Sequence, residues 1–107
     1  DELGVQGLRF MRRGGLDYWF KPLANGDWAM TILNPTRLPI VCKVNWQDFN
    51  FTDEAVSKRS TAFNKIVYKV RNLWTGRMEG KTSLKNKIDR QLTIPAQDVV
   101  TYRLYRK

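Results

Sequence analysis

Catalytic chemistry in this chain would have to come from carboxylates, because the other common catalytic side chains are absent or isolated. The 107 residues include no histidine and a single cysteine, Cys42. A serine, threonine or cysteine nucleophile normally needs an adjacent base, which is most often histidine. One cysteine can form neither an internal disulfide nor a cysteine-rich zinc site. We therefore predict that the chain holds no metal and no cofactor.

Paired carboxylates remain as a source of chemistry, since two of them can hydrolyse a glycosidic bond. The chain has ten acidic residues. Most of them stand in expected turns or at expected strand ends, where aspartate is favoured because it bonds to the nearby backbone. The acids in such positions are Asp17, Asp27, Asp48, Asp53, Glu54, Glu79, Asp89 and Asp98. We predict no catalytic residue within the chain.

The charge of the chain raises a second possibility, which is binding of a polyanion. The formal net charge is +9, and residues 58–107 carry thirteen basic against three acidic side chains. Such an asymmetry fits either a surface for phosphates or an anionic polysaccharide, or a basic face in water. The candidate cations are Lys65, Lys69, Arg71, Arg77, Lys81, Lys85 and Lys87. Because they are scattered singly through apolar segments, we favour the solvated face and expect no nucleic-acid partner.

The stretch "KIVYKVRNLWTG" at residues 65–76 favours the same interpretation through its periodicity. Apolar and basic residues alternate there with the period of a strand. The inward set is Ile66, Tyr68 and Val70. The pattern predicts that Tyr68 lies in the core, while Lys69 and Arg71 face water.

Other segments show the same two-residue period, separated by proline and glycine breaks. The expected strands are residues 17–23, 28–33, 40–46, 66–71, 91–94 and 99–106, with 81–90 as a weak edge strand or a loop. Asn25-Gly26 is a hairpin signal, because both residues accept a positive φ. Cys42 falls on the apolar side of its segment, which predicts a small buried side chain rather than a reactive thiol.

About seven or eight short strands without crossover helices predict an all-β fold, an antiparallel β-sandwich of Greek-key type. We expect one domain over residues 1–107, with residues 47–64 as a loop or insertion. No apolar run is long enough to cross a membrane, and the start "DELGVQG" does not read as a signal peptide.

Four stretches, in order along the chain, resemble one protein family. They are "DELGVQG" at 1–7, "GLDYWFKPLANGDWAMTILN" at 15–34, "KVRNLWTG" at 69–76 and "IPAQDVVTYRL" at 94–104. Each is similar to a segment of the C-terminal domain of glycoside hydrolase family 27, the α-galactosidases (melibiases) and α-N-acetylgalactosaminidases. Asn72 stands where the family motif usually has aspartate, and Gln97-Asp98 stands where His-Gly is frequent.

The resemblance implies a non-catalytic accessory domain. Family members are retaining enzymes that use two aspartates on a (β/α)₈ barrel, and both would lie upstream of Asp1. Residues 1–10 would then be an entry segment from that barrel, and the sandwich would pack against the barrel and stabilise it. The parent protein would act on α-galactosides and would be secreted or periplasmic, or lysosomal in a eukaryote.

Packing against a barrel would explain the position of Trp19. Strict alternation sends it outward with Asp17 and Lys21, although large aromatics are typical of faces that another protein surface covers. We predict an apolar interdomain patch of Leu3, Val5 and Trp19, through which the isolated domain would self-associate. The alternative is that the loop at 47–64 covers this face.

A carbohydrate-binding module is a further alternative. Such a module needs coplanar exposed aromatic rings, which Trp28, Trp46 and Trp74 could supply. Alternation places Trp28 and Trp46 with the core residues, so we prefer the accessory domain.

Overall fold

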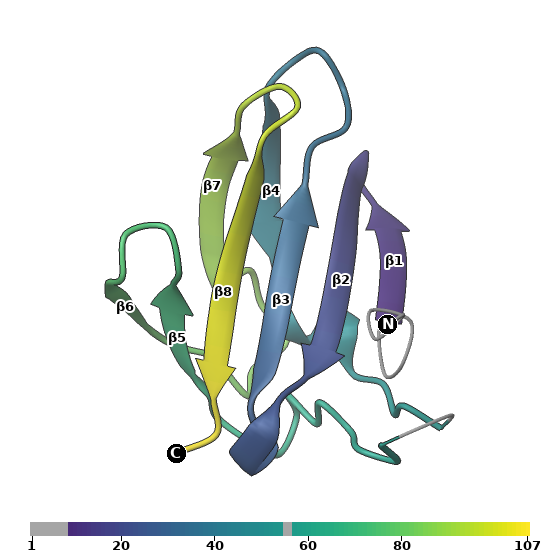
Figure 1. Ribbon diagram of the computed structural model, residues 1–107, viewed down its shortest axis with the longest axis vertical. Coiled ribbons are helices and arrows are strands. Elements are labelled where there is room, and N and C mark those ends of the chain that lie inside the picture. The colour runs from purple at the N-terminus through teal and green to yellow at the C-terminus, as the bar shows by residue number, and fades with distance from the viewer. Residues whose placement is uncertain (1–8, 55–56) are drawn as a thin grey trace.

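The computed structural model describes residues 9–54 and 57–107 and has the predicted all-β architecture. Its eight strands form two antiparallel sheets (Figure 1). They are β1 (Arg9–Arg13), β2 (Leu16–Pro22), β3 (Trp28–Leu33), β4 (Ile40–Val44), β5 (Lys69–Asn72), β6 (Met78–Lys81), β7 (Arg90–Ile94) and β8 (Val99–Tyr105). The helical segments within these ranges are two 3₁₀ turns, η1 (Ala24–Gly26) and η2 (Trp46–Phe49), and neither could span a membrane.

The strand order explains why the two sheets form a sandwich. The larger sheet has the order β1-β2-β3-β8-β5-β6, and β4 pairs with β7 in the smaller one. After β3 the chain crosses to β4 in the smaller sheet and returns to the larger sheet as β5 and β6. It then crosses a second time to β7, and β8 comes back to lie between β3 and β5, as in a Greek key. Figure 1 shows β4 and β7 behind the larger sheet.

The core lies between the sheets and follows the two-residue period of the strands. On β3 the inward side chains Trp28, Met30 and Ile32 are fully buried. Tyr68 and Cys42 are also buried, as predicted. Aromatic side chains of the loop at 47–64 complete this core, since Phe49 lies 5.3 Å from Phe20 between ring centroids and Phe63 lies 5.3 Å from Tyr68.

The predicted hairpin turn at Asn25-Gly26 is confirmed. Both residues have a positive φ, 63° and 81°. The turn joins β2 to β3 and sets their register, which places Trp19 opposite Thr31. A side chain at position 26 would also meet Arg106, because a Cβ there would lie 2.8 Å from the Arg106 Cδ.

Three details differ from the sequence-based expectation. The strand expected over 66–71 begins only at Lys69, because Ala62 has a φ of 49° and its carbonyl accepts the N–H of Ile66 in a turn. Strands β1 and β6 were not predicted, since neither "RFMRR" nor "MEGK" shows an apolar period. Arg9 and Phe10, expected in the entry segment, begin β1.

Candidate interdomain interface

Seven acidic side chains of the described residues make contacts that serve the fold. Asp17 pairs with Arg12 at 2.6 Å, and Asp27 pairs with Arg103 at 2.9 Å. Elsewhere, Asp48 pairs with Arg13, Glu79 with Arg90, Asp89 with the Trp46 indole, Asp53 with Ser57, and Asp98 with the Val99 N–H. The contacts of Asp53 and Asp98 are the local bonds that aspartate makes in turns and at strand ends. Those of Asp27, Asp48 and Asp89 join segments far apart in the sequence.

Cys42 lies in an environment that keeps its thiol protonated. Its side chain is 1% exposed, and the Sγ lies 3.2 Å from the Oη of Tyr18. Burial raises the pKa of the Cys42 thiol, and the contact with Tyr18 lowers it by less. Because the thiolate is the reactive form, this cysteine acts as a core residue. Over residues 9–54 and 57–107, no three His, Cys, Asp or Glu side chains gather into a possible metal site.

The candidate site is instead the outer face of the larger sheet, which faces the viewer in Figure 1. The register places Phe10, Trp19, Thr31 and Thr101 in one row across β1, β2, β3 and β8. Leu33 and Val99 face each other in the adjoining row. We call these six side chains the outer patch: Phe10, Trp19, Thr31, Leu33, Val99 and Thr101.

The outer patch carries no charge. The other face of the same sheet is buried in the core, so a face in water would be expected to hold charged side chains here. On β3 the outward side chains are Ala29, Thr31 and Leu33, and all three are half-buried. Ion pairs flank the patch, because Arg12–Asp17 continues the Leu33 row and Arg103–Asp27 lies beyond Thr101. An uncharged centre with a polar border is the usual composition of a protein–protein interface.

Trp19 is half-buried and points outward, as alternation predicted, and the ring of Phe10 lies 5.1 Å from it. Its contact in the outer patch is therefore with β1, a strand that the sequence did not predict. Leu3 and Val5 lie outside the described residues. Their part in an interface, with that of Trp19, stays a prediction.

The three tryptophans considered for a carbohydrate-binding surface differ in exposure, as expected. Trp28 and Trp46 are fully buried, whereas Trp74 is 70% exposed. A coplanar set of the three is therefore excluded. The candidate cations Lys69, Arg71 and Lys81 come together on the β5–β6 edge, where Lys69 faces Lys81, and Arg71 faces Arg103 of β8.

Sequence reasoning missed most of the outer patch for one reason. The outward orientation of Thr31, Leu33 and Thr101 follows from alternation alone. Their proximity follows from the pairing of β3 with β8, and Thr31 and Thr101 are 70 positions apart in the chain. The two-residue period carries no information on that pairing.

Comparison with known proteins identifies the fold and the family. Residues 13–104 match the family model described as the alpha galactosidase C-terminal beta sandwich domain. The chain is 29% identical over 104 residues to alpha-galactosidase A of Cellvibrio japonicus, a match that covers 97% of this chain and 24% of that protein.

Solved structures show the same fold at low identity. A putative α-N-acetylgalactosaminidase of Bacillus halodurans matches with a TM-score of 0.67 and 11% identity, over 94% of this chain and 20% of that one. α-Galactosidase I of Mortierella vinacea matches with a TM-score of 0.63 and 19% identity, over 91% and 22%. The chain thus spans about a quarter or less of the length of these relatives. It belongs to the family of α-galactosidase C-terminal β-sandwich domains.

Proposed function

We propose that this chain is the non-catalytic accessory domain of an α-galactosidase-like glycoside hydrolase, and that its outer patch packs against the catalytic barrel of the same polypeptide. The family supports the first part, because its relatives are four to five times longer than the match. The role of the domain is to cover part of the barrel surface and so stabilise the enzyme.

The observation that carries the proposal is the uncharged outer face of β3. In a sheet with one face in water, strands alternate between apolar inward and polar outward side chains. On β3 the outward positions hold Ala29, Thr31 and Leu33 instead, beside the exposed Phe10 ring and the half-buried Trp19 ring. Covering these side chains would remove apolar surface from water, which favours association by roughly 25 cal/mol per Å².

The test is a Thr31→Arg substitution in the whole enzyme that contains this domain. Thr31 is half-buried on the outer face, so an arginine can extend into water in the isolated domain but meets the barrel in the enzyme. We expect a lower unfolding temperature for the whole enzyme and little change for the isolated domain. Turnover of a chromogenic α-galactoside at low temperature should stay unchanged, because the change lies outside the barrel.

A matched control is Val41→Arg, on the outer face of the smaller sheet, where the side chain is 51% exposed. This variant should leave both unfolding temperatures unchanged. If Thr31→Arg and Val41→Arg affected the whole enzyme equally, the outer patch would not be the interface.

A further inference from the structure

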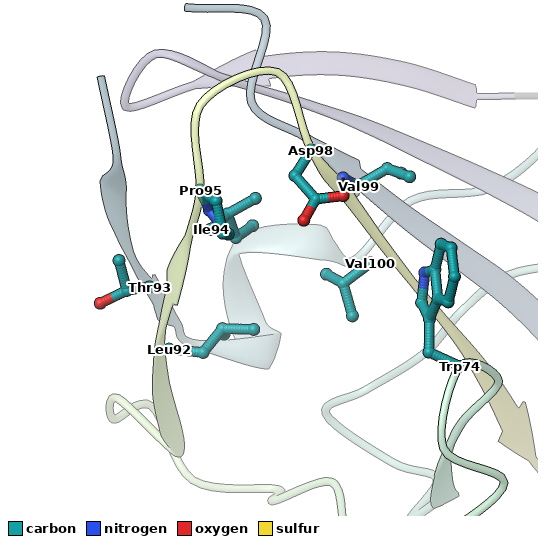
Figure 2. Close-up of a pocket in the computed structure, with 8 residues that line it drawn as sticks. All are labelled: Trp74, Leu92, Thr93, Ile94, Pro95, Asp98, Val99 and Val100. Carbon is teal, nitrogen blue, oxygen red and sulfur yellow. Dashed lines mark hydrogen bonds between the residues drawn. The ribbon is translucent and has the colours of Figure 1, made fainter. Parts of the chain in front are cut away.

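A groove opens at the side of the sandwich (Figure 2), and Val99 is the one residue that it shares with the outer patch. The strand β5 pairs only with the second half of β8, and the groove lies between the first half of β8 and β7. Its volume is about 250 Å³. The lining is apolar apart from two residues: Trp74, Leu92, Thr93, Ile94, Pro95, Asp98, Val99 and Val100. Figure 2 shows the Trp74 ring on one side and Leu92, Ile94 and Pro95 on the other.

Trp74 adds little to the core, yet the turn that carries it is held in place by hydrogen bonds. Its side chain is 70% exposed, more than any other aromatic ring among the described residues. The turn that carries it is closed by Asn72, whose Oδ1 accepts the Trp74 N–H at 2.8 Å and whose carbonyl accepts the Gly76 N–H at 2.8 Å. The N–H of Leu73 also bonds to the Thr101 carbonyl of β8 at 2.9 Å. An aromatic ring on an anchored turn loses little conformational freedom when a ligand stacks on it.

Asp98 supplies the polar group at the same groove. Its Oδ1 accepts the Val99 N–H at 2.8 Å, which orients the carboxylate. Figure 2 shows this carboxylate between the β7 wall and Val99, on the side of the chain that faces the groove. The second oxygen is exposed and can accept hydroxyl groups. Carboxylates are strong acceptors of such hydrogen bonds.

We propose that this groove binds one galactopyranosyl residue, stacked on Trp74 and hydrogen-bonded to Asp98. Its volume is below the roughly 300–1,000 Å³ of pockets that enclose drug-sized ligands, so it suits a single ring. A pyranose combines an apolar C–H face with hydroxyl groups on its edge, which matches an aromatic ring beside a carboxylate. In galactose the axial 4-hydroxyl leaves the hydrogens on C3, C4 and C5 together on one face, and glucose lacks this arrangement.

The proposal does not depend on packing against a barrel, because the groove lies between β7 and β8 and shares only Val99 with the outer patch. It assigns the domain a contact with the end of a galactose-bearing oligosaccharide. One aromatic ring and one carboxylate give weak affinity, with a dissociation constant on the order of 1–10 mM.

The experiment is a titration of the ¹⁵N-labelled chain with methyl α-D-galactopyranoside, followed by NMR. We expect saturable shifts at the Trp74 indole N–H and at the amides of Asp98 and Val100. Trp74→Ala should weaken binding about tenfold or more, and Trp74→Phe less, since a smaller ring still stacks. Asp98→Asn keeps an acceptor for the Val99 N–H but removes the charge, so it should weaken binding severalfold. The control Leu38→Ala, at an exposed apolar side chain elsewhere, should bind like the unmodified chain.

Three results would overturn the proposal. The first is the lack of saturable shifts at about 50 mM sugar, well above the expected dissociation constant. The second is equal affinity for methyl α-D-glucopyranoside, which would remove the selectivity for galactose. The third is shifts at the amides of Asp98 and Val100 that follow protein concentration without sugar and disappear in Trp74→Ala, because the groove would then hold a second copy of the chain.

Discussion

Tyr68 joins the hydrophobic core to the long loop that follows β4. Its ring lies 5.3 Å from Phe63 between centroids, and its hydroxyl donates a hydrogen bond to the Thr61 carbonyl at 2.6 Å. Its backbone N–H is bonded to the hydroxyl of Thr82, which is also buried. The side chain therefore holds residues 61–63 against the edge of the larger sheet.

Replacement of Tyr68 tests this role. Tyr68→Ala should lower the free energy of unfolding by roughly 3–5 kcal/mol, as for other large aromatic side chains removed from a core. Tyr68→Phe should cost about 1 kcal/mol, because the Thr61 carbonyl loses its donor. Lys69→Ala, at the exposed neighbour, should change the same quantity by less than about 0.5 kcal/mol. Urea unfolding measures all three, and similar losses in Tyr68→Ala and Lys69→Ala would contradict the assignment of faces.

Alkaline pH should destabilise the domain through Cys42 and Tyr18. Burial raises the pKa of both groups above their ordinary values of 9.0 and 10.0. Above those values the unfolded chain loses protons that the folded chain keeps, so stability falls as pH rises. Stability is complete below about pH 9 and declines above it.

Unfolding free energies measured between neutral pH and about pH 10.5 check this prediction. Cys42→Ala should reduce the first part of the decline, because it removes the group with the lower ordinary pKa. A free energy of unfolding that stays constant or increases over this range would contradict the proposed burial effect.

At the scale of elements, the crossing from β3 to β4 depends on one buried amide. Asn34 is fully buried, and its Nδ2 donates to the carbonyls of Leu38 and Ile94 at 2.8 and 3.0 Å. Its Oδ1 accepts the N–H and the hydroxyl of Thr36. This side chain thus links the end of a strand in the larger sheet to β7 in the smaller one.

Asn34→Ala should therefore destabilise the sandwich by roughly 1–3 kcal/mol, because it removes the hydrogen bonds of a fully buried amide to the Leu38 and Ile94 carbonyls and to Thr36. Asn64→Ala provides the matched control at an exposed asparagine and should have an effect within about 0.5 kcal/mol. Hydrogen exchange of the β4 and β7 amides should accelerate in Asn34→Ala only. Equal stability of the two variants would show that the amide does not hold the sheets together.

The sequence predicted the elements more completely than their arrangement. Met30 and Ile32 follow a strict two-residue period, and so their burial could be predicted. β6 could not, since "MEGK" contains a glycine and two charges and pairs through its backbone with β5 across an irregular register. The groove at Trp74 was also beyond prediction, because residues 74, 92 and 100 meet only through the pairing of β5 with β8 and the packing of the smaller sheet, which contains β7, against the larger one.

At the scale of the molecule, the buried acids of the described residues are committed to the fold. Asp17 and Asp27 are buried against arginines, so a change at either removes the partner of a cation as well. We expect the isolated chain to release no product from a chromogenic α-galactoside above background. Turnover that survives repurification and disappears on mutation of an acidic residue in this chain would overturn the proposed function.

The larger sheet cannot be completed during synthesis until β8, the last of its strands in the chain order, has been made. Residues 99–105 form the strand between β3 and β5, so the larger sheet is divided in two until they arrive. A nascent chain that ends before them leaves the facing edges of β3 and β5 unpaired. Such unpaired strand edges are prone to aggregate during folding. The sandwich therefore assembles only after its final strand has left the ribosome, and the arginine-rich β1 and lysine-ended β6 keep the outermost edges of that sheet soluble meanwhile.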